Sequence, residues 1–232
     1  MRMIHTRITV LLAAMLCMAI ALLSWRAYEI HRRSKAPTIN KRPIVVIDAG
    51  HGTFTDIGLL DYGATRHGIR EADVVFEIAR CLHKKLECNG WIAVTTRDGE
   101  FTPLSLIERS MLASYLGADA FISIHTNSFR TRHPSGLSVH YWSEESKQLA
   151  ELIQTILSTK LGMKDRGVVK HPFTVLVWAS VPAVLIELGF ISNPQEATRL
   201  ANPQFHRKAA DAIAQALTLW IHSRCDEDTT CF

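Results

Sequence analysis

The sequence predicts a single α/β domain with a mainly parallel, mixed central sheet of about six strands, covered by helices on both faces. Apolar runs of strand length alternate with stretches of helical period along residues 43–222. Several of these runs are almost continuously apolar, as strands are when both faces of a sheet are covered. Short alternation of this kind favours one α/β domain. Without an N-terminal segment, roughly 190 residues remain, enough for one domain with a sizeable core.

The elements follow from these patterns in order. In 71–88, the residues Val75, Ile78 and Leu82 recur at the spacing of one helix face. The other helices show similar stripes, and 104–116 is ended by Gly117. We expect strands at 43–48, 91–96, 119–125, 136–142, 174–178 and 183–188, and helices at 71–88, 104–116, 144–161 and 205–222.

The N-terminal segment, 1–35, is distinct from this domain. Its core, residues 8–25, is an uncharged and mostly apolar run of 18 residues, just long enough to cross a bilayer. No clear small-residue cleavage site follows it, so an uncleaved signal anchor is favoured over a cleaved export signal or an apolar helix of a cytosolic protein. Residues 36–42 are expected to form a linker, and 223–232 a polar C-terminal tail.

Charge argues against one class of function, and the cysteines leave the redox compartment open. The net charge of +4 arises in 1–35, which holds six of the 26 Lys and Arg residues, so the domain is close to neutral. A nucleic-acid-binding face is therefore not indicated. Cys81 and Cys88 lie on one predicted helix too far apart to bond. Cys225 and Cys231 would either close a small disulfide loop in an exported protein or remain free thiols.

Two histidines follow predicted strands directly. His51 stands in Asp48-Ala49-Gly50-His51-Gly52 after the apolar run 43–47, and His125 follows Phe121-Ile122-Ser123-Ile124 at the end of the expected strand 119–125. Ligands of open α/β sheets collect at the carboxyl ends of strands, so both side chains can converge at one edge. Either histidine alone would more simply be a hydrogen-bonded loop or core residue. Their common placement favours a shared site.

Two glutamates are candidates for the same site. Glu71 begins the helix 71–88 on its apolar stripe, where a carboxylate is costly to bury unless it is paired or binds a metal. A first-turn acid stabilised by the helix dipole is the alternative. Glu187 interrupts an otherwise apolar strand, and a salt bridge with Arg97 or Arg109 is the alternative to a proton-accepting role. Two histidines and one carboxylate with an open fourth position form a catalytic zinc site suited to amide hydrolysis.

At these residues the chain resembles the zinc-dependent N-acetylmuramoyl-L-alanine amidases of the amidase-3 type, over about residues 43–222. The resemblance rests on ordered motifs: Val46–Gly52, Gly63-Ala64 with Glu71 beyond, Thr96-Arg97, Leu106 with Arg109, Ser123–Asn127, Pro182–Glu187 and Gly189–Asn193. It implies a phosphorylase/hydrolase-like fold and an amidase catalytic domain. It also implies one Zn²⁺ per chain held by His51, Glu71 and His125, with Glu187 as general base.

The resemblance further implies the substrate, peptidoglycan or muramyl peptides, cleaved between N-acetylmuramic acid and L-alanine. We expect a monomer in the bacterial cell envelope, anchored in the inner membrane through 8–25 and facing the outer side or periplasm, or secreted if cleaved. A zinc carboxypeptidase or aminopeptidase on a similar scaffold is one alternative. A non-catalytic peptidoglycan-binding protein that retains the fold is the other.

The chain departs from the family between His51 and Glu71. These residues are 20 positions apart, several more than is usual, and the extra length is 53–62. Glu71 is therefore the least secure ligand, with Glu77 as the fallback acid. The short stretch 128–135 leaves no room for the autoinhibitory helix of related cell-division amidases.

Weaker expectations concern neighbouring polar residues. Asp48 could accept a hydrogen bond from His51 or cap a loop. Arg97 and Arg109 are expected to be structural ion-pair partners or to contact substrate carboxylates, and Asn127 to orient the His125 loop or form a simple turn. The remaining histidines considered are expected not to be ligands: His67, His133, His140 and His171.

Overall fold

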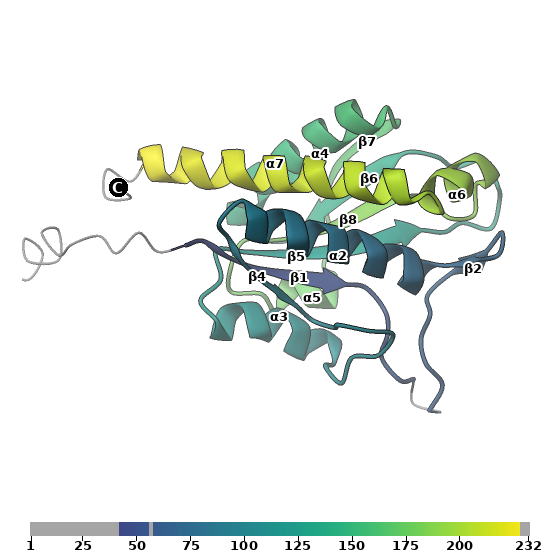
Figure 1. The fold of residues 1–232 in the computed structure, drawn as a ribbon, viewed down its shortest axis with the longest axis horizontal. Helices are drawn as coiled ribbons and strands as arrows, with labels where there is room; N and C mark the ends of the chain where they lie inside the picture. Colours follow the sequence, from purple (N-terminus) through teal and green to yellow (C-terminus); the bar gives the residue numbers. More distant parts are fainter. Residues whose placement is uncertain (1–41, 56–57, 228–232) are drawn as a thin grey trace, which may run out of the picture. The chain divides into compact units, whose positions relative to one another are not determined.

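The computed structural model describes residues 42–55 and 58–227. Their centre is a six-stranded sheet with the strand order β4-β1-β5-β8-β6-β7 (Figure 1). All neighbouring strands are parallel except β6 and β8, which are antiparallel, so the sheet is mixed as predicted. The strands are β1 (Ile44–Ala49), β4 (Ile92–Thr95), β5 (Ala120–Asn127), β6 (Leu137–Tyr141), β7 (Asp165–Lys170) and β8 (Ala183–Phe190). A separate two-stranded hairpin pairs β2 (Thr65–Arg66) with β3 (Ile69–Arg70).

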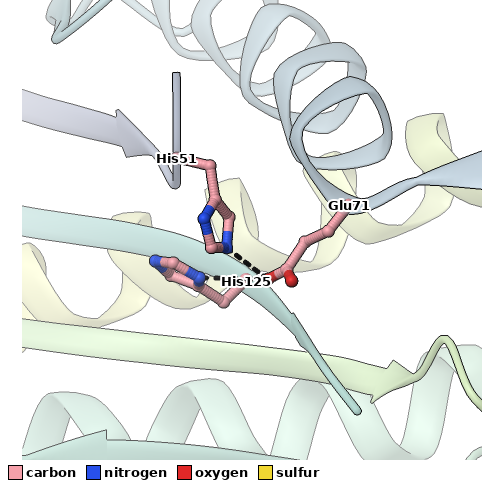
Figure 2. A group of neighbouring side chains, drawn as sticks. All are labelled: His51, Glu71 and His125. Atoms are coloured by element: carbon pink, nitrogen blue, oxygen red, sulfur yellow. Dashed lines mark hydrogen bonds and ion pairs between the residues drawn. The ribbon is translucent and has the colours of Figure 1, made fainter. Parts of the chain in front are cut away.

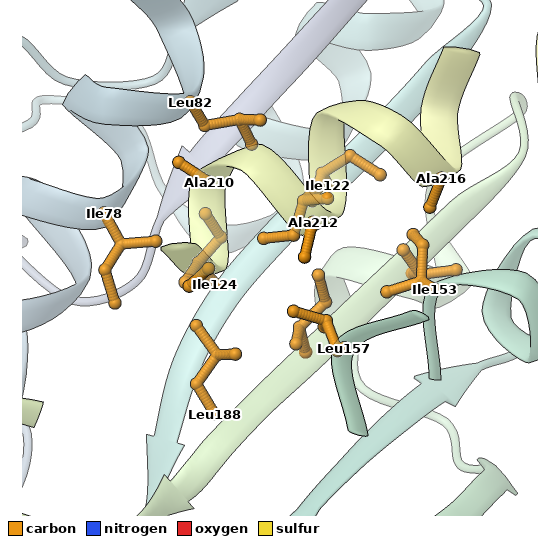
Figure 3. Close-up of a cluster of buried hydrophobic side chains, with 14 of the residues drawn as sticks. Ile78, Leu82, Ile122, Ile124, Ile153, Leu157, Leu188, Ala210, Ala212 and Ala216 are labelled. Atoms are coloured by element: carbon orange, nitrogen blue, oxygen red, sulfur yellow. The ribbon is translucent and has the colours of Figure 1, made fainter. Parts of the chain in front are cut away.

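Helices cover both faces of the sheet. The larger core cluster combines residues of α2 (Glu71–Cys88), α4 (Glu144–Leu161) and α7 (Pro203–Glu227) with alternate residues of the strands, and Figure 3 shows its aliphatic centre. The smaller cluster joins the opposite face to α3 (Leu106–Tyr115) and α5 (Thr174–Val177). Adjacent strand residues therefore belong to different clusters: Val45 and Ile47 to the larger, Val46 to the smaller. This two-sided burial explains the continuous apolar runs.

Two predicted helix boundaries have visible causes. Ser105 Oγ accepts a hydrogen bond from Glu108 N, and Ser105 N donates one to Glu108 Oε2, a capping box that begins α3. Gly162 ends α4 in the left-handed conformation, at φ 58°, where a residue without Cβ is least strained. These local signals place both helices close to their predicted ranges.

One predicted strand is wrong. Residues 174–178 form the short helix α5 and its C-cap, because Val175 and Leu176 pack into the smaller core cluster from a single turn. The sixth strand is instead β7, whose sequence DRGVVK is mostly exposed at the edge of the sheet. An edge strand with charged ends has no apolar run to reveal it. Helix α6 (Pro194–Leu200), begun by an Asn193 cap, was also not predicted.

The strand register brings the candidate residues to one edge of the sheet. β1 pairs with β5 through Asp48 opposite Ser123, and β5 pairs with β8 through His125 opposite Glu187. These three neighbouring strands are parallel, so their carboxyl ends meet. Among the described residues, no helix is long and apolar enough to cross a membrane. The apolar run 8–25 and Cys231 lie outside what the structure describes, and so does the question whether Cys225 and Cys231 are bonded.

Candidate metal and catalytic centre

His51 leaves the end of β1 in a conformation that few side chains adopt. Its φ is 65°, in the left-handed region where a Cβ is strained. Two contacts hold this backbone: Arg109 Nη2 donates to the His51 carbonyl at 2.6 Å, and Gly50 N donates to the Ile124 carbonyl at 3.1 Å. The turn directs the imidazole across the ends of β1 and β5 (Figure 2).

Glu71 is the first residue of α2 and is 4% exposed. Its carboxylate accepts backbone hydrogen bonds from Ala64 at 3.1 Å and Thr126 at 3.0 Å. Neither bond comes from a cation, and the side chain is directed toward the two histidines rather than outward from the helix terminus. The helix dipole can stabilise a negative charge here, but it does not explain the two imidazoles.

The three side chains converge. Glu71 Oε1 lies 3.0 Å from His51 Nε2 and 3.1 Å from His125 Nδ1, as Figure 2 shows. One potential ligand atom from each residue lies within 4.8 Å of the others. Although His51 Nε2 is close to Glu71, it is buried without a properly directed hydrogen-bond partner among the described residues. Within that part of the chain, this is the one group of three such side chains that could hold a metal ion.

Two glycines make room for the group. A Cβ on Gly50 would come within 2.3 Å of the His125 ring, and one on Gly63 within 2.6 Å of His51 Nε2 and 2.8 Å of Glu71 Oε2. Gly63 also has a φ of 66°. Any larger residue would displace the donor atoms, so the local sequence is compatible with a small ion between them. Two imidazoles and a carboxylate form a donor set that zinc accepts.

The charges of this cluster are strongly coupled. Burial alone would lower the pKa of His51, but the carboxylates of Glu71 and Asp61 outweigh it and raise that pKa to about 9. Burial would raise the pKa of Glu71, yet the facing His125 and His51 hold it well below its ordinary value. Without a metal, the site therefore keeps an ionised carboxylate between imidazoles. A metal cation could replace the proton of His51 as the positive charge that faces Glu71.

Glu187 lies beside this cluster on β8. Its Oε2 atom is buried and has no hydrogen-bond partner among the described residues. Burial, reinforced by the negative charge of Glu71, raises the pKa of Glu187 to about 7 although His125 and His51 oppose the shift. The salt bridge considered from the sequence is absent, because Arg109 pairs with Asp48 and Arg97 donates to backbone carbonyls.

Asp48 does not contact His51. It is fully buried and accepts hydrogen bonds from Thr96 Oγ1 at 2.7 Å, Ser123 Oγ at 2.7 Å and Arg109 Nη1 at 3.1 Å. The suggestion that Asp48 supports His51 is therefore wrong. Arg97 donates to the carbonyls of Ala49, Gly50, Ala72 and Gly99, which stabilises the loop after β1. Both arginines are structural, and neither is directed at solvent.

The residue that contacts His51 is Asp61, which the sequence analysis did not single out. Asp61 Oδ2 lies 2.8 Å from His51 Nδ1. Asp61 belongs to the extra segment after His51, and its distance of ten positions hid the pairing. The available signal was its place two residues before Gly63, where the recognised motif Gly63-Ala64 begins.

The extra segment does not separate Glu71 from His51. Gly52 N donates to the Asp61 carbonyl at 2.9 Å and Asp61 N donates to the Thr53 carbonyl at 2.8 Å, so the two ends of the segment meet. Because the segment ends where it begins, Glu71 Oε1 lies 3.0 Å from His51 Nε2 although the two residues are 20 positions apart in the sequence. The fallback acid Glu77 instead pairs with Arg80 at 2.6 Å on the solvent side.

The sequence of residues 45–219 matches the family model described as N-acetylmuramoyl-L-alanine amidase. The chain belongs to this family. The family assignment agrees with the resemblance inferred from the ordered motifs, and its members are hydrolases of the bacterial cell wall.

Similar proteins support the assignment. The amidase LytC of Bacillus subtilis (strain 168) is 37% identical over 181 residues, 75% of this chain but only 35% of LytC. The protein YqiI of the same organism is also 37% identical, and 82% of its length is covered against 75% of this chain. The structure of the amidase AmiC2 of Nostoc punctiforme is similar with a TM-score of 0.72 at 33% identity, over 78% of this chain and 98% of AmiC2. The fold class predicted from the sequence is confirmed.

A further solved relative has a partner. The amidase CwlD of Clostridioides difficile, in complex with the GerS lipoprotein, shares 26% identity with a TM-score of 0.72, over 78% of this chain and all of CwlD. The match thus covers nearly all of the AmiC2 and CwlD chains but about a third of LytC.

Proposed function

We propose that this chain is a zinc-dependent N-acetylmuramoyl-L-alanine amidase whose metal ligands are His51, Glu71 and His125. The convergence of these three donors at the carboxyl ends of parallel strands is the main support. When bound there, zinc would supply a water of pKa about 7 and polarise a substrate carbonyl. A zinc ion held by three protein ligands would keep a position for water or substrate.

The chain's own residues would perform the proton transfers. Glu187 Oε2 is buried and has no hydrogen-bond partner among the described residues, so this oxygen can accept a proton from a water beside the metal site. It would take the proton from the attacking water and deliver it to the departing amide nitrogen. The parallel register of His125 and Glu187 keeps this base beside the metal site.

The substrate we propose is peptidoglycan or its muramyl peptides, cleaved between the lactyl group of N-acetylmuramic acid and L-alanine. Family membership supports this choice, as do the names of the similar proteins. We further propose that 43–222 is the catalytic domain and that 8–25 anchors or exports it, so that the enzyme acts in the cell envelope.

Product analysis tests the proposal. The purified full-length chain, incubated with muramyl peptides, is expected to release the intact stem peptide and a peptide-free muramic acid, and a chelator should stop this release. Mass spectrometry identifies the products. Cleavage between amino acids instead would indicate a peptidase, and wall binding without any product would indicate a non-catalytic protein.

A matched variant tests the base. Glu187→Gln retains the shape of the side chain but cannot accept a proton, so activity should fall at least about 100-fold while zinc content is unchanged. Glu77→Gln, at a half-buried acid that pairs with Arg80 away from the site, should retain full activity. Full activity in Glu187→Gln would exclude this mechanism.

A further inference from the structure

Asp61 is held from four sides at the point where the extra segment returns to His51. Its backbone carbonyl accepts from Gly52 N at 2.9 Å, and its own N donates to the Thr53 carbonyl at 2.8 Å. Its side chain uses both oxygens: Oδ1 accepts from Gly63 N at 2.9 Å, and Oδ2 lies 2.8 Å from His51 Nδ1. Such anchoring distinguishes Asp61 from an ordinary surface acid, whose ion pairs contribute little.

The two nitrogens of the His51 ring have different surroundings. Nδ1 faces Asp61, a carboxylate that accepts but cannot donate when ionised. Nε2 lies 3.0 Å from Glu71 Oε1, in the cluster with His125. The Nδ1 proton therefore belongs to the Asp61 hydrogen bond, which leaves the Nε2 lone pair for a metal.

We propose that Asp61 is a positioning residue that orients His51 and holds its Nδ1–H tautomer, so that the extra segment contributes to metal binding through His51. The contact gives the extra length after His51 a role in the site. A carboxylate hydrogen-bonded to a liganding histidine fixes its ring and raises its basicity, and losing such a partner typically costs about 10–100-fold in metal affinity. This inference rests on the proposed zinc site.

The isosteric substitution Asp61→Asn separates orientation from folding. An asparagine has one acceptor oxygen, whereas Asp61 serves two N–H groups, from Gly63 and His51. If the oxygen stays with Gly63, the amide NH₂ faces His51 Nδ1 and disfavours a proton there. The backbone contacts of the loop remain, so the fold should survive.

The test compares the full-length wild type, Asp61→Asn and the control Asp211→Asn. Asp211 is an exposed acid of α7 that pairs with Lys85, in the last turn of α2 and so far from Glu71. Zinc affinity is measured by chelator competition. Asp61→Asn should bind zinc about 10–100-fold more weakly, and Asp211→Asn should match the wild type. Circular dichroism checks that each variant is folded.

Proton NMR of the zinc-loaded proteins supplies a readout that a purely structural role would not change. The wild type should show a low-field Nδ1–H resonance of His51, assigned by its loss in His51→Gln, and Asp61→Asn should lose or shift it upfield. Wild-type affinity and an unchanged resonance in Asp61→Asn would overturn the inference while leaving the zinc enzyme intact. A wild type that binds no zinc would instead overturn the proposed function.

Discussion

At the scale of single residues, the site consists of buried charges whose partners are incomplete until a cation is added. Glu71 lies between His51 and His125, and Glu187 has a buried oxygen without a partner among the described residues. Proteins rarely leave such groups unpaired, because each costs folding free energy. The arrangement is a common feature of active sites, where stability is lost in exchange for reactivity.

Glu187 provides a pH-dependent test of that cost. Because burial raises its pKa from 4.5 to about 7, folding favours the protonated form, and the penalty of the ionised form grows as pH rises from about 4.5 through about 7. In metal-free protein, Glu187→Gln should therefore be more stable than the wild type at pH 8, by about 1–3 kcal/mol, and equal to it near pH 4. Urea unfolding at both pH values measures this. Destabilisation at pH 8 would show that Glu187 has a stabilising partner.

Arg109 and Asp48 form the fully buried ion pair beneath the His51 loop, 3.1 Å apart. Arg109→Met should destabilise the protein by about 3–5 kcal/mol, since Asp48 is left charged and buried. The double variant with Asp48→Asn should lose less than the sum of the two single changes, because no unpaired charge remains. Denaturant unfolding of the four proteins gives the coupling energy, and strict additivity would refute the pairing.

The candidate site residues could be picked out from the sequence because each is tied to a local pattern. His51 and His125 directly follow apolar strands, and Glu187 interrupts one. Asp61 escaped because its partner is ten positions away across a loop. A contact between Asp48 and His51 was suggested wrongly, since nothing in the local sequence shows that the Asp48 side chain instead faces Thr96, Ser123 and Arg109. Long-range pairings of this kind depend on tertiary structure.

At the scale of elements, Glu196 joins α6 to the sheet. Glu196 is 6% exposed, and its carboxylate accepts from Gly136 N at 2.7 Å, before β6, and from Phe190 N at 2.6 Å, at the end of β8. One side chain thus satisfies two buried backbone donors on neighbouring strands. Burial raises its pKa, although both N–H donors oppose that shift.

Replacing Glu196 should therefore loosen the β6–β8 edge. Glu196→Ala leaves two buried N–H groups without acceptors and should cost about 2–4 kcal/mol, whereas Glu196→Gln keeps one acceptor and should cost about half as much. Chemical denaturation ranks the variants, with the exposed Glu151→Ala as control. Equal costs for Ala and Gln would indicate that packing, not the paired hydrogen bonds, matters here.

Elements with an apolar signature were predictable, and those without one were not. β1, β5 and β8 are buried on both faces and coincide closely with their predicted ranges. β7 is polar and exposed, and its pairing with β6 depends on being placed at the sheet edge. The apolar segment 174–178 was mistaken for a strand because a short buried run has no periodicity that distinguishes a strand from a helical turn.

At the scale of the whole domain, metal binding and folding should be linked. The three proposed ligands come from the loop after β1, the start of α2 and the end of β5, which meet only in the folded state. Zinc should therefore raise the melting temperature. The free energy of unfolding should increase by about 4 kcal/mol when free zinc exceeds the dissociation constant about 1,000-fold. Differential scanning calorimetry with zinc and with chelator measures it. The shift should vanish in His125→Ala, and its persistence there would place the ion elsewhere.

The most direct test of the account is anomalous X-ray diffraction at the zinc absorption edge from crystals of the zinc-loaded protein. We predict one peak, about 2.0–2.2 Å from a nitrogen of His51, a nitrogen of His125 and a carboxylate oxygen of Glu71. The absence of a peak at these residues, or a single peak at other side chains, would contradict the central claim that they form the catalytic metal site.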